Sequence, residues 1–125
     1  MNGLFFVMIG GALGAGARYA LSQFMAVCVA TSFPWATFSA NVLGSLAMGI
    51  LMGWLARGGG SETARLFVGV GLLGGFTTFS SFSLEFWMLF ERGQTGAAFG
   101  YAAMSVVGAL MACSLGFLLF KQVAA

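Results

Sequence analysis

The chain has 125 residues, of which 60% are hydrophobic and only 6% are charged, and its formal net charge is +2. A soluble domain normally has about a quarter of its residues charged, so this composition excludes a water-soluble globule and indicates a surface that lies in lipid. The sequence contains no histidine, which removes the commonest general base and metal ligand. An enzyme is therefore the least expected class of function.

Long apolar runs predict an all-α membrane protein with four transmembrane helices. Each crossing needs about 20 apolar residues, so four crossings use the whole chain and leave no soluble domain. No basic segment precedes the first run, which is therefore expected to be a retained helix rather than a signal peptide. We predict one transmembrane domain over residues 1–125, with helices at about residues 3–30, 35–56, 63–90 and 95–120.

Small residues recur at every fourth position along three of these helices. In lipid, helices associate through close packing of small residues, so these faces predict tight helix contacts and self-association. Cys28 and Cys113 stand alone in apolar runs and are expected to pack as small hydrophobic residues. The small-residue faces comprise Gly10 and Gly14 in the first helix, Asn41, Ser45, Gly49 and Gly53 in the second, and Gly108, Ala112 and Gly116 in the fourth.

Two polar side chains, Arg18 and Asn41, interrupt apolar runs. A polar residue inside a membrane helix is a candidate functional residue by default. Asn41 has the alternative role of bonding a neighbouring helix. Arg18 has the alternatives of anchoring a helix end or pairing with a carboxylate across an interface.

The middle of the third run combines features that weaken a helix. Gly74 and Gly75 are followed by Thr77 and Thr78, and both residue types disfavour a continuous helix. We therefore predict that the third helix is broken at its centre. A break would turn carbonyls toward a cation and the N-terminus of a second half-helix toward an anion. The alternative is a glycine kink whose hydroxyls bond to their own helix.

Two stripes follow this point at helical spacing. One consists of Phe76, Phe79, Phe82 and Phe86, and the other consists of Thr77, Ser81 and Glu85. Aromatic rings have a positive edge, so ring edges beside hydroxyls are suited to a small, hard anion. The alternative is that the rings simply face lipid.

The basic residues bear on how the chain is oriented in the membrane. With four crossings, Arg57, Arg65 and Lys121 share one side with both termini, whereas Arg92 lies on the other, joined by Arg18 if its side chain extends to the nearer helix end. Orientation follows the excess of basic residues in cytoplasmic loops, and three against two is a small excess. Insertion in both orientations, and a dimer of opposed subunits, is therefore compatible with the sequence.

Three motifs, in order along the whole chain, resemble the Fluc (CrcB-like) family of fluoride channels. The third-helix motif is the most specific, and it departs from the family only in having Ser80-Ser81 where Ser-Thr is usual. The motifs are Gly10-Gly11 with Ala15 and Arg18-Tyr19, then Thr37 with Asn41 and Gly44-Ser45, then the string from Gly74 to Ser83 with Glu85.

This resemblance implies an antiparallel, dual-topology homodimer in the bacterial inner membrane that exports fluoride passively and relieves its toxicity. It also implies a structural sodium ion (Na⁺) at the dimer centre, held by the backbone carbonyls that match Gly74 and Thr77. Arg18 and Glu85 are assigned a vestibule or structural role, and no nucleic-acid partner is expected. The fluoride pathway is expected to include Asn41, Phe79, Ser81 and Phe82, with Thr37, Ser105 and Tyr101 as further candidates.

Two other functions remain as alternatives. A small proton-coupled multidrug exporter also has about four helices, but that class uses a carboxylate in its first helix, where this chain has Arg18 and no acid. A non-transporting assembly subunit would need no polar interior and would leave the phenylalanine and hydroxyl stripes without a role.

Overall fold

The computed structural model describes residues 2–123 as a bundle of four long apolar helical spans. This confirms the prediction of an all-α membrane protein with four helices long enough to cross a bilayer. The first two spans are α1 (Asn2–Cys28) and α2 (Trp35–Ala56), and the fourth is α6 (Thr95–Val123). The third span, Glu62–Glu91, contains several segments. They are α3 (Glu62–Ala64), η1 (Arg65–Leu73), α4 (Gly74–Phe76) and α5 (Ser80–Glu91).

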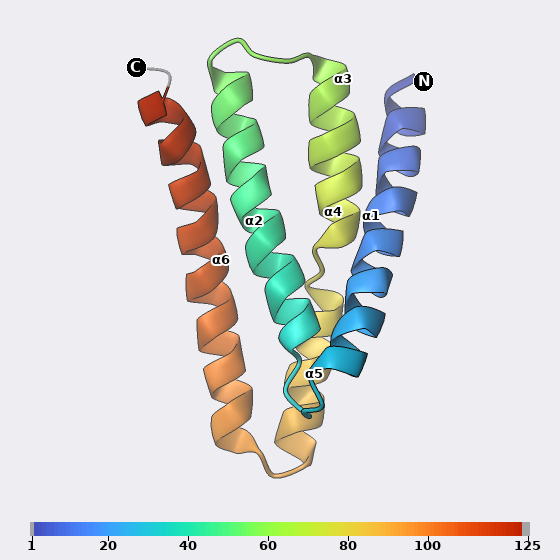
Figure 1. Cartoon of the computed structure of the whole chain (residues 1–125), viewed down its shortest axis with the longest axis vertical. Helices are drawn as coiled ribbons and strands as arrows, with labels where there is room; N and C mark the ends of the chain where they lie inside the picture. The colour runs from blue at the N-terminus through green and yellow to red at the C-terminus, as the bar shows by residue number, and fades with distance from the viewer. Residues whose placement is uncertain (1, 124–125) are drawn as a thin grey trace.

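Two features distinguish the third span from a regular α-helix. Its η1 segment is a π-helix, and the N–H group of Gly74 bonds to the carbonyl of Gly69, five residues earlier. Residues 77–79 are not helical, and Thr77 has extended backbone angles, φ −85° and ψ 157°. The span therefore consists of two parts. The first part, drawn as the upper part in Figure 1, ends at Phe76, and the second, drawn as the lower part, begins at Ser80.

Glycines set the closest helix contacts. A Cβ atom at Gly10 or Gly14 of α1 would overlap the backbone of η1, at the carbonyls of Phe67 and Leu72 respectively. A Cβ atom at Gly49 of α2 would likewise overlap a backbone carbonyl of α6, that of Cys113. The predicted close packing is confirmed at these three positions. Gly108 differs, because a Cβ atom there would make only an ordinary contact, 3.4 Å from Val42.

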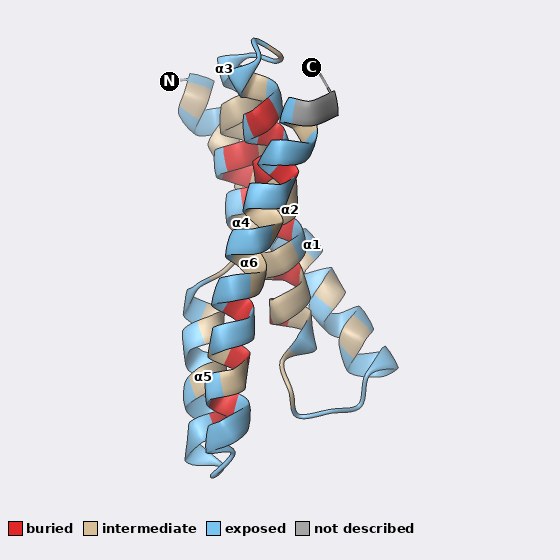
Figure 2. Cartoon of the chain, turned by 90° about the vertical axis from the view of Figure 1, so that its left-hand side faces the viewer, coloured by how far each residue is buried: buried red, intermediate tan, exposed pale blue. Residues whose placement is uncertain are grey.

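The spans are arranged as a V in Figure 1, with α2 beside α6 and α1 beside the upper part of the third span. The start of α1 and the end of α6 lie at the same end of the bundle as the loop between α2 and α3. Figure 2 shows that the buried residues follow the inner faces of the helices, whereas the outer faces are exposed. Exposed apolar side chains such as Val27 and Leu110 are suited to contact with lipid or with another membrane chain.

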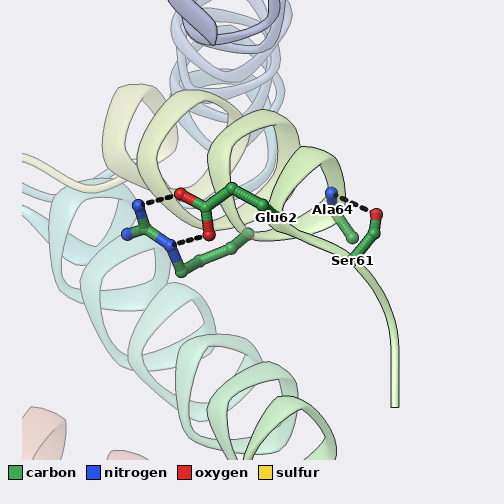
Figure 3. Close-up of polar contacts among 4 residues, drawn as sticks. Ser61, Glu62 and Ala64 are labelled. Carbon is green, nitrogen blue, oxygen red and sulfur yellow. Dashed lines mark hydrogen bonds and ion pairs between the residues drawn. The ribbon is translucent and has the colours of Figure 1, made fainter. Parts of the chain in front are cut away.

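The third span begins with a local polar cap at the end of the bundle (Figure 3). The Ser61 hydroxyl accepts a 3.2 Å hydrogen bond from the backbone N–H of Ala64. The Arg65 guanidinium donates two hydrogen bonds to the Glu62 carboxylate, of 2.8 and 2.7 Å. A serine cap and an acidic residue in the first turn both stabilise a helix N-terminus. These exposed contacts therefore define where the third span starts.

Candidate functional site

The interruption of the third span is paired with α2 through one side chain. The Asn41 amide oxygen accepts a 2.7 Å hydrogen bond from the Thr78 backbone N–H. The Asn41 amide nitrogen donates a 2.9 Å bond to the Thr78 carbonyl. Asn41 therefore bonds a neighbouring helical span, which was one of its two predicted roles.

These bonds change which carbonyls of the third span have a helical partner. In an α-helix each N–H bonds to the carbonyl four residues earlier. The Thr78 N–H would reach Gly74, but it bonds to Asn41. The Ser81 N–H would reach Thr77, but it bonds to the Thr78 hydroxyl at 3.2 Å. The carbonyls of Gly74 and Thr77 are thus released from the pairing that a continuous helix would give them.

Arg18 contacts the third span at the same level. Its Nε atom donates a 3.3 Å hydrogen bond to the carbonyl of Gly75, across from α1 to α4. The side chain is half-buried and points toward the interrupted helix rather than to the end of α1. Within the single chain its hydrogen-bond partner is thus a backbone carbonyl, and the predicted pairing with a carboxylate across an interface stays a prediction.

Hydroxyl groups near the interruption also bond to their own helix. The Thr77 hydroxyl donates a 2.9 Å bond to the Leu73 carbonyl, and the Ser83 hydroxyl donates a 2.9 Å bond to the Phe79 carbonyl. This is the pattern expected for a kinked helix, and it coexists with the non-helical residues 77–79.

A cavity of about 460 Å³ lies against the interruption, between α2 and α6. None of its described lining residues is charged. Ser105 is 6% exposed, and among the described residues its hydroxyl has no hydrogen-bond partner. The cavity brings together six of the predicted site residues, which are Asn41, Gly74, Thr77, Phe79, Phe82 and Ser105.

Three other predicted residues, Thr37, Glu85 and Tyr101, form a second cluster, whereas Ser81 belongs to neither group and contacts Thr78 through its backbone N–H. The Glu85 carboxylate accepts hydrogen bonds from the Thr37 hydroxyl at 2.7 Å and from the Tyr101 hydroxyl at 2.8 Å. Thr37 and Tyr101 are buried. Phe82 connects the two clusters, because it lines the cavity and its ring centroid lies 5.1 Å from that of Tyr101.

The phenylalanine stripe divides at the interruption. Phe79 and Phe82 lie ring to ring beside the cavity. Phe86 instead packs against Phe99 of α6, with ring centroids 5.3 Å apart. Phe76 ends α4, before the interruption. A single row of four rings would need a continuous helix, and the non-helical residues 77–79 change the register between Phe76 and the rest.

Comparison with known proteins identifies the family. The family model described as CrcB-like protein, Camphor Resistance (CrcB), matches residues 5–117. The chain belongs to the CrcB family. The resemblance seen in the sequence motifs is thereby confirmed.

Curated relatives of this CrcB-family chain match along its full length. A protein of Sphingopyxis alaskensis is 62% identical over 126 residues, covering 100% of both chains. A protein of Novosphingobium aromaticivorans is 50% identical, and the match covers 99% of this chain and 100% of the relative. One from Mesorhizobium japonicum is 48% identical and covers 98% of each. All three are named fluoride-specific ion channel FluC.

The names of these relatives are those of ion channels, and they favour neither a multidrug exporter nor an enzyme. The protein is a multi-pass integral membrane protein of the bacterial plasma membrane.

Proposed function

We propose that this chain is the subunit of a fluoride-selective channel that exports fluoride passively and relieves its toxicity. The observation that carries the proposal is the cavity at the interrupted span. It joins the rings of Phe79 and Phe82 to the polar groups of Asn41 and Ser105 without a charged lining residue. Ring edges and hydroxyl or amide hydrogens attract a small anion without holding it as a fixed cation would. The proposal that the ion is fluoride is supported by the names of the full-length relatives.

The proposed pathway runs from this cavity to the cluster of Thr37, Glu85 and Tyr101. Phe82 contacts both regions, and Ser81 precedes it at the start of α5. Fluoride would replace its hydration with the ring edges of Phe79 and Phe82 and with the Ser105 hydroxyl, because the Thr37 and Tyr101 hydroxyls already donate to Glu85. The N-terminus of α5 adds a positive dipole end beside the cavity. Selectivity over chloride follows from a narrow row of donors suited to a smaller, harder ion.

We propose that the working unit is an antiparallel homodimer. The supporting observation is that Phe79, which lines the cavity, has 76% of its surface exposed in the single chain. A second copy of the chain would cover this ring and close the cavity. Of the five basic residues, Arg57 and Arg65 flank the loop between α2 and η1, Lys121 lies near the end of α6 and Arg92 follows α5, whereas Arg18 bonds to Gly75. The count of three against one does not itself support opposed orientations, so the antiparallel arrangement is proposed on the exposed Phe79 ring.

A structural sodium ion is part of the proposal, and the residues present fit it. Sodium is bound by carbonyl oxygens of unwound helices in membrane proteins. The carbonyls of Gly74 and Thr77 have lost their usual N–H partners to Asn41 and to the Thr78 hydroxyl. The ion would supply a fixed positive charge at the crossing of the two interrupted spans. In this proposal Arg18 has a structural role, holding the next carbonyl, that of Gly75.

Flux from liposomes tests the proposed function. Vesicles that contain the purified protein are loaded with potassium fluoride, and efflux is followed with a fluoride electrode after valinomycin is added. We expect rapid fluoride release without a proton gradient. Failure to release fluoride, together with uptake of a cationic dye driven by a pH gradient, would replace the channel with a multidrug exporter.

A further inference from the structure

One side chain, that of Asn41, takes part in two regions of the site at once. It lines the cavity together with Phe79. Its amide oxygen and nitrogen are both bonded to the backbone of Thr78, at 2.7 and 2.9 Å. Because both ends of the amide are engaged by the backbone, binding an anion cannot be the only role of this side chain.

We propose that Asn41 is a positioning residue that keeps the third helix interrupted and thereby presents the Gly74 carbonyl to a cation. The Thr78 N–H has two acceptors within reach of its chain position. One is the Asn41 oxygen that it uses, and the other is the Gly74 carbonyl that a regular helix would provide. A backbone N–H in the apolar layer needs a partner. Because the Asn41 oxygen accepts the hydrogen bond from this N–H, the Gly74 carbonyl lacks its helical hydrogen bond.

Two neighbouring contacts show that the helices on either side support the same geometry. Gly44, one turn after Asn41 on α2, lies so close to the Thr77 methyl group that a Cβ atom would overlap it. From α1, Arg18 donates to the Gly75 carbonyl. Helix α2 thus contacts the interruption at Thr77 and Thr78, while the guanidinium occupies the carbonyl beside Gly74. The position of the Gly74 carbonyl is set from both sides, and Asn41 provides the bond that competes directly with helix formation.

This arrangement couples the cavity to the proposed cation site. Any change that moves the Asn41 amide alters both the cavity lining and the partner of the Thr78 N–H. The identity of the cation as sodium rests on the proposed function. The hydrogen bond between the Thr78 N–H and Asn41 does not depend on that function.

The test compares variants of the full-length protein in detergent, with two readouts. The first is hydrogen exchange of the Thr78 amide, followed by NMR. The second is sodium affinity, from titration of sodium chloride into protein held in N-methylglucamine chloride and followed by ²³Na NMR. Asn41→Leu removes both bonds to Thr78. Ser39→Ala, on the same helix but outside the cavity lining, is the matched control.

For Asn41→Leu we expect the Thr78 N–H to bond to the Gly74 carbonyl, so that Thr78 exchange slows by about tenfold or more, as in a regular helix, and sodium affinity falls by about tenfold. Ser39→Ala should stay within about threefold of the unmodified protein in both readouts. If Asn41→Leu does not give a folded protein, Asn41→Ser, which is too short to reach Thr78 in the same way, carries the same expectation.

Unchanged Thr78 exchange and unchanged sodium affinity in the Leu or Ser variant would overturn the inference, even if fluoride flux were lost. That result would make Asn41 an anion contact only. If the unmodified protein neither bound sodium nor released fluoride, the proposed function would fail instead, and the exchange readout would still decide the role of Asn41.

Discussion

The rings of Phe79 and Phe82 lie with their centroids 5.4 Å apart and tilted by 52°, but the chain covers only one of them. Phe82 packs against the buried Tyr101 ring. Phe79 is 76% exposed. Phe82 is thus fixed within the subunit, whereas Phe79 lies at the surface that we assign to the partner subunit. Substitutions at the two positions should therefore have different consequences.

Replacing Phe79 by isoleucine should reduce fluoride flux without destabilising the isolated subunit fold. The isoleucine keeps an apolar side chain but removes the positive ring edge, and losing about 1.5 kcal/mol of aromatic interaction corresponds to roughly a tenfold lower rate. The measurement is fluoride efflux from liposomes with equal amounts of folded protein, checked by size-exclusion chromatography. Unchanged flux would remove Phe79 from the pathway.

Replacing Phe82 by isoleucine should lower both flux and stability. Its ring contacts Tyr101 inside the subunit, and an aromatic pair contributes about 0.5–1.5 kcal/mol beyond its buried area. Thermal unfolding in detergent should show a lower midpoint for this variant than for Phe79→Ile. Equal midpoints for the two variants would contradict the distinction between a fixed ring and an exposed ring.

Removing either hydroxyl that bonds to Glu85 should destabilise the protein. Thr37→Val and Tyr101→Phe each delete one donor to the half-buried carboxylate, and a hydrogen bond to a charged group contributes about 1.5–3 kcal/mol. Ser83→Ala is the control, because its exposed hydroxyl bonds to its own helix, and it should change stability by less than about 0.5 kcal/mol. Denaturation of all three variants measures the difference, and equal stabilities would show that the Glu85 cluster is not stabilising.

Two glycines of α1 provide a matched pair for the helix contact. A Cβ atom at Gly14 would overlap the Leu72 carbonyl, so Gly14→Ala should destabilise by about 1–3 kcal/mol despite the better helix propensity of alanine. A Cβ atom at Gly16 meets nothing within 4 Å, so Gly16→Ala should be neutral or stabilise by up to about 1 kcal/mol. Thermal unfolding compares them, and a destabilised Gly16→Ala with a normal Gly14→Ala would contradict the packing described.

The sequence predicted the four spans within a few residues, because the length of an apolar run is a direct physical requirement for crossing a bilayer. It did not predict the π-helix at Arg65–Leu73. That segment is apolar on nearly all sides, so its hydrophobic pattern cannot distinguish a π-helical from an α-helical period. The close approach of Gly10 and Gly14 was predictable, since small residues at that spacing are required where helix backbones meet.

The polar contacts of the site were only partly predictable. The sequence marked Arg18, Asn41 and Glu85 as polar residues in apolar runs, but it could not give their partners, which depend on how separate helices align. Arg18 bonds to a carbonyl of the third span, and Asn41 bonds to Thr78, a residue to which no individual role had been assigned. Thr78 could have been found from its position directly after the glycine pair, where a threonine hydroxyl can cap the following half-helix.

The central claim is selectivity for fluoride through the cavity of Phe79, Phe82 and Asn41. The most direct measurement loads liposomes with equal concentrations of fluoride and chloride and records both ions, with ion-specific electrodes, after valinomycin starts efflux. The account predicts rapid loss of fluoride with chloride retained, and a slower fluoride loss in Phe79→Ile. Equal efflux of the two ions, or no efflux of either from folded dimer, would contradict it.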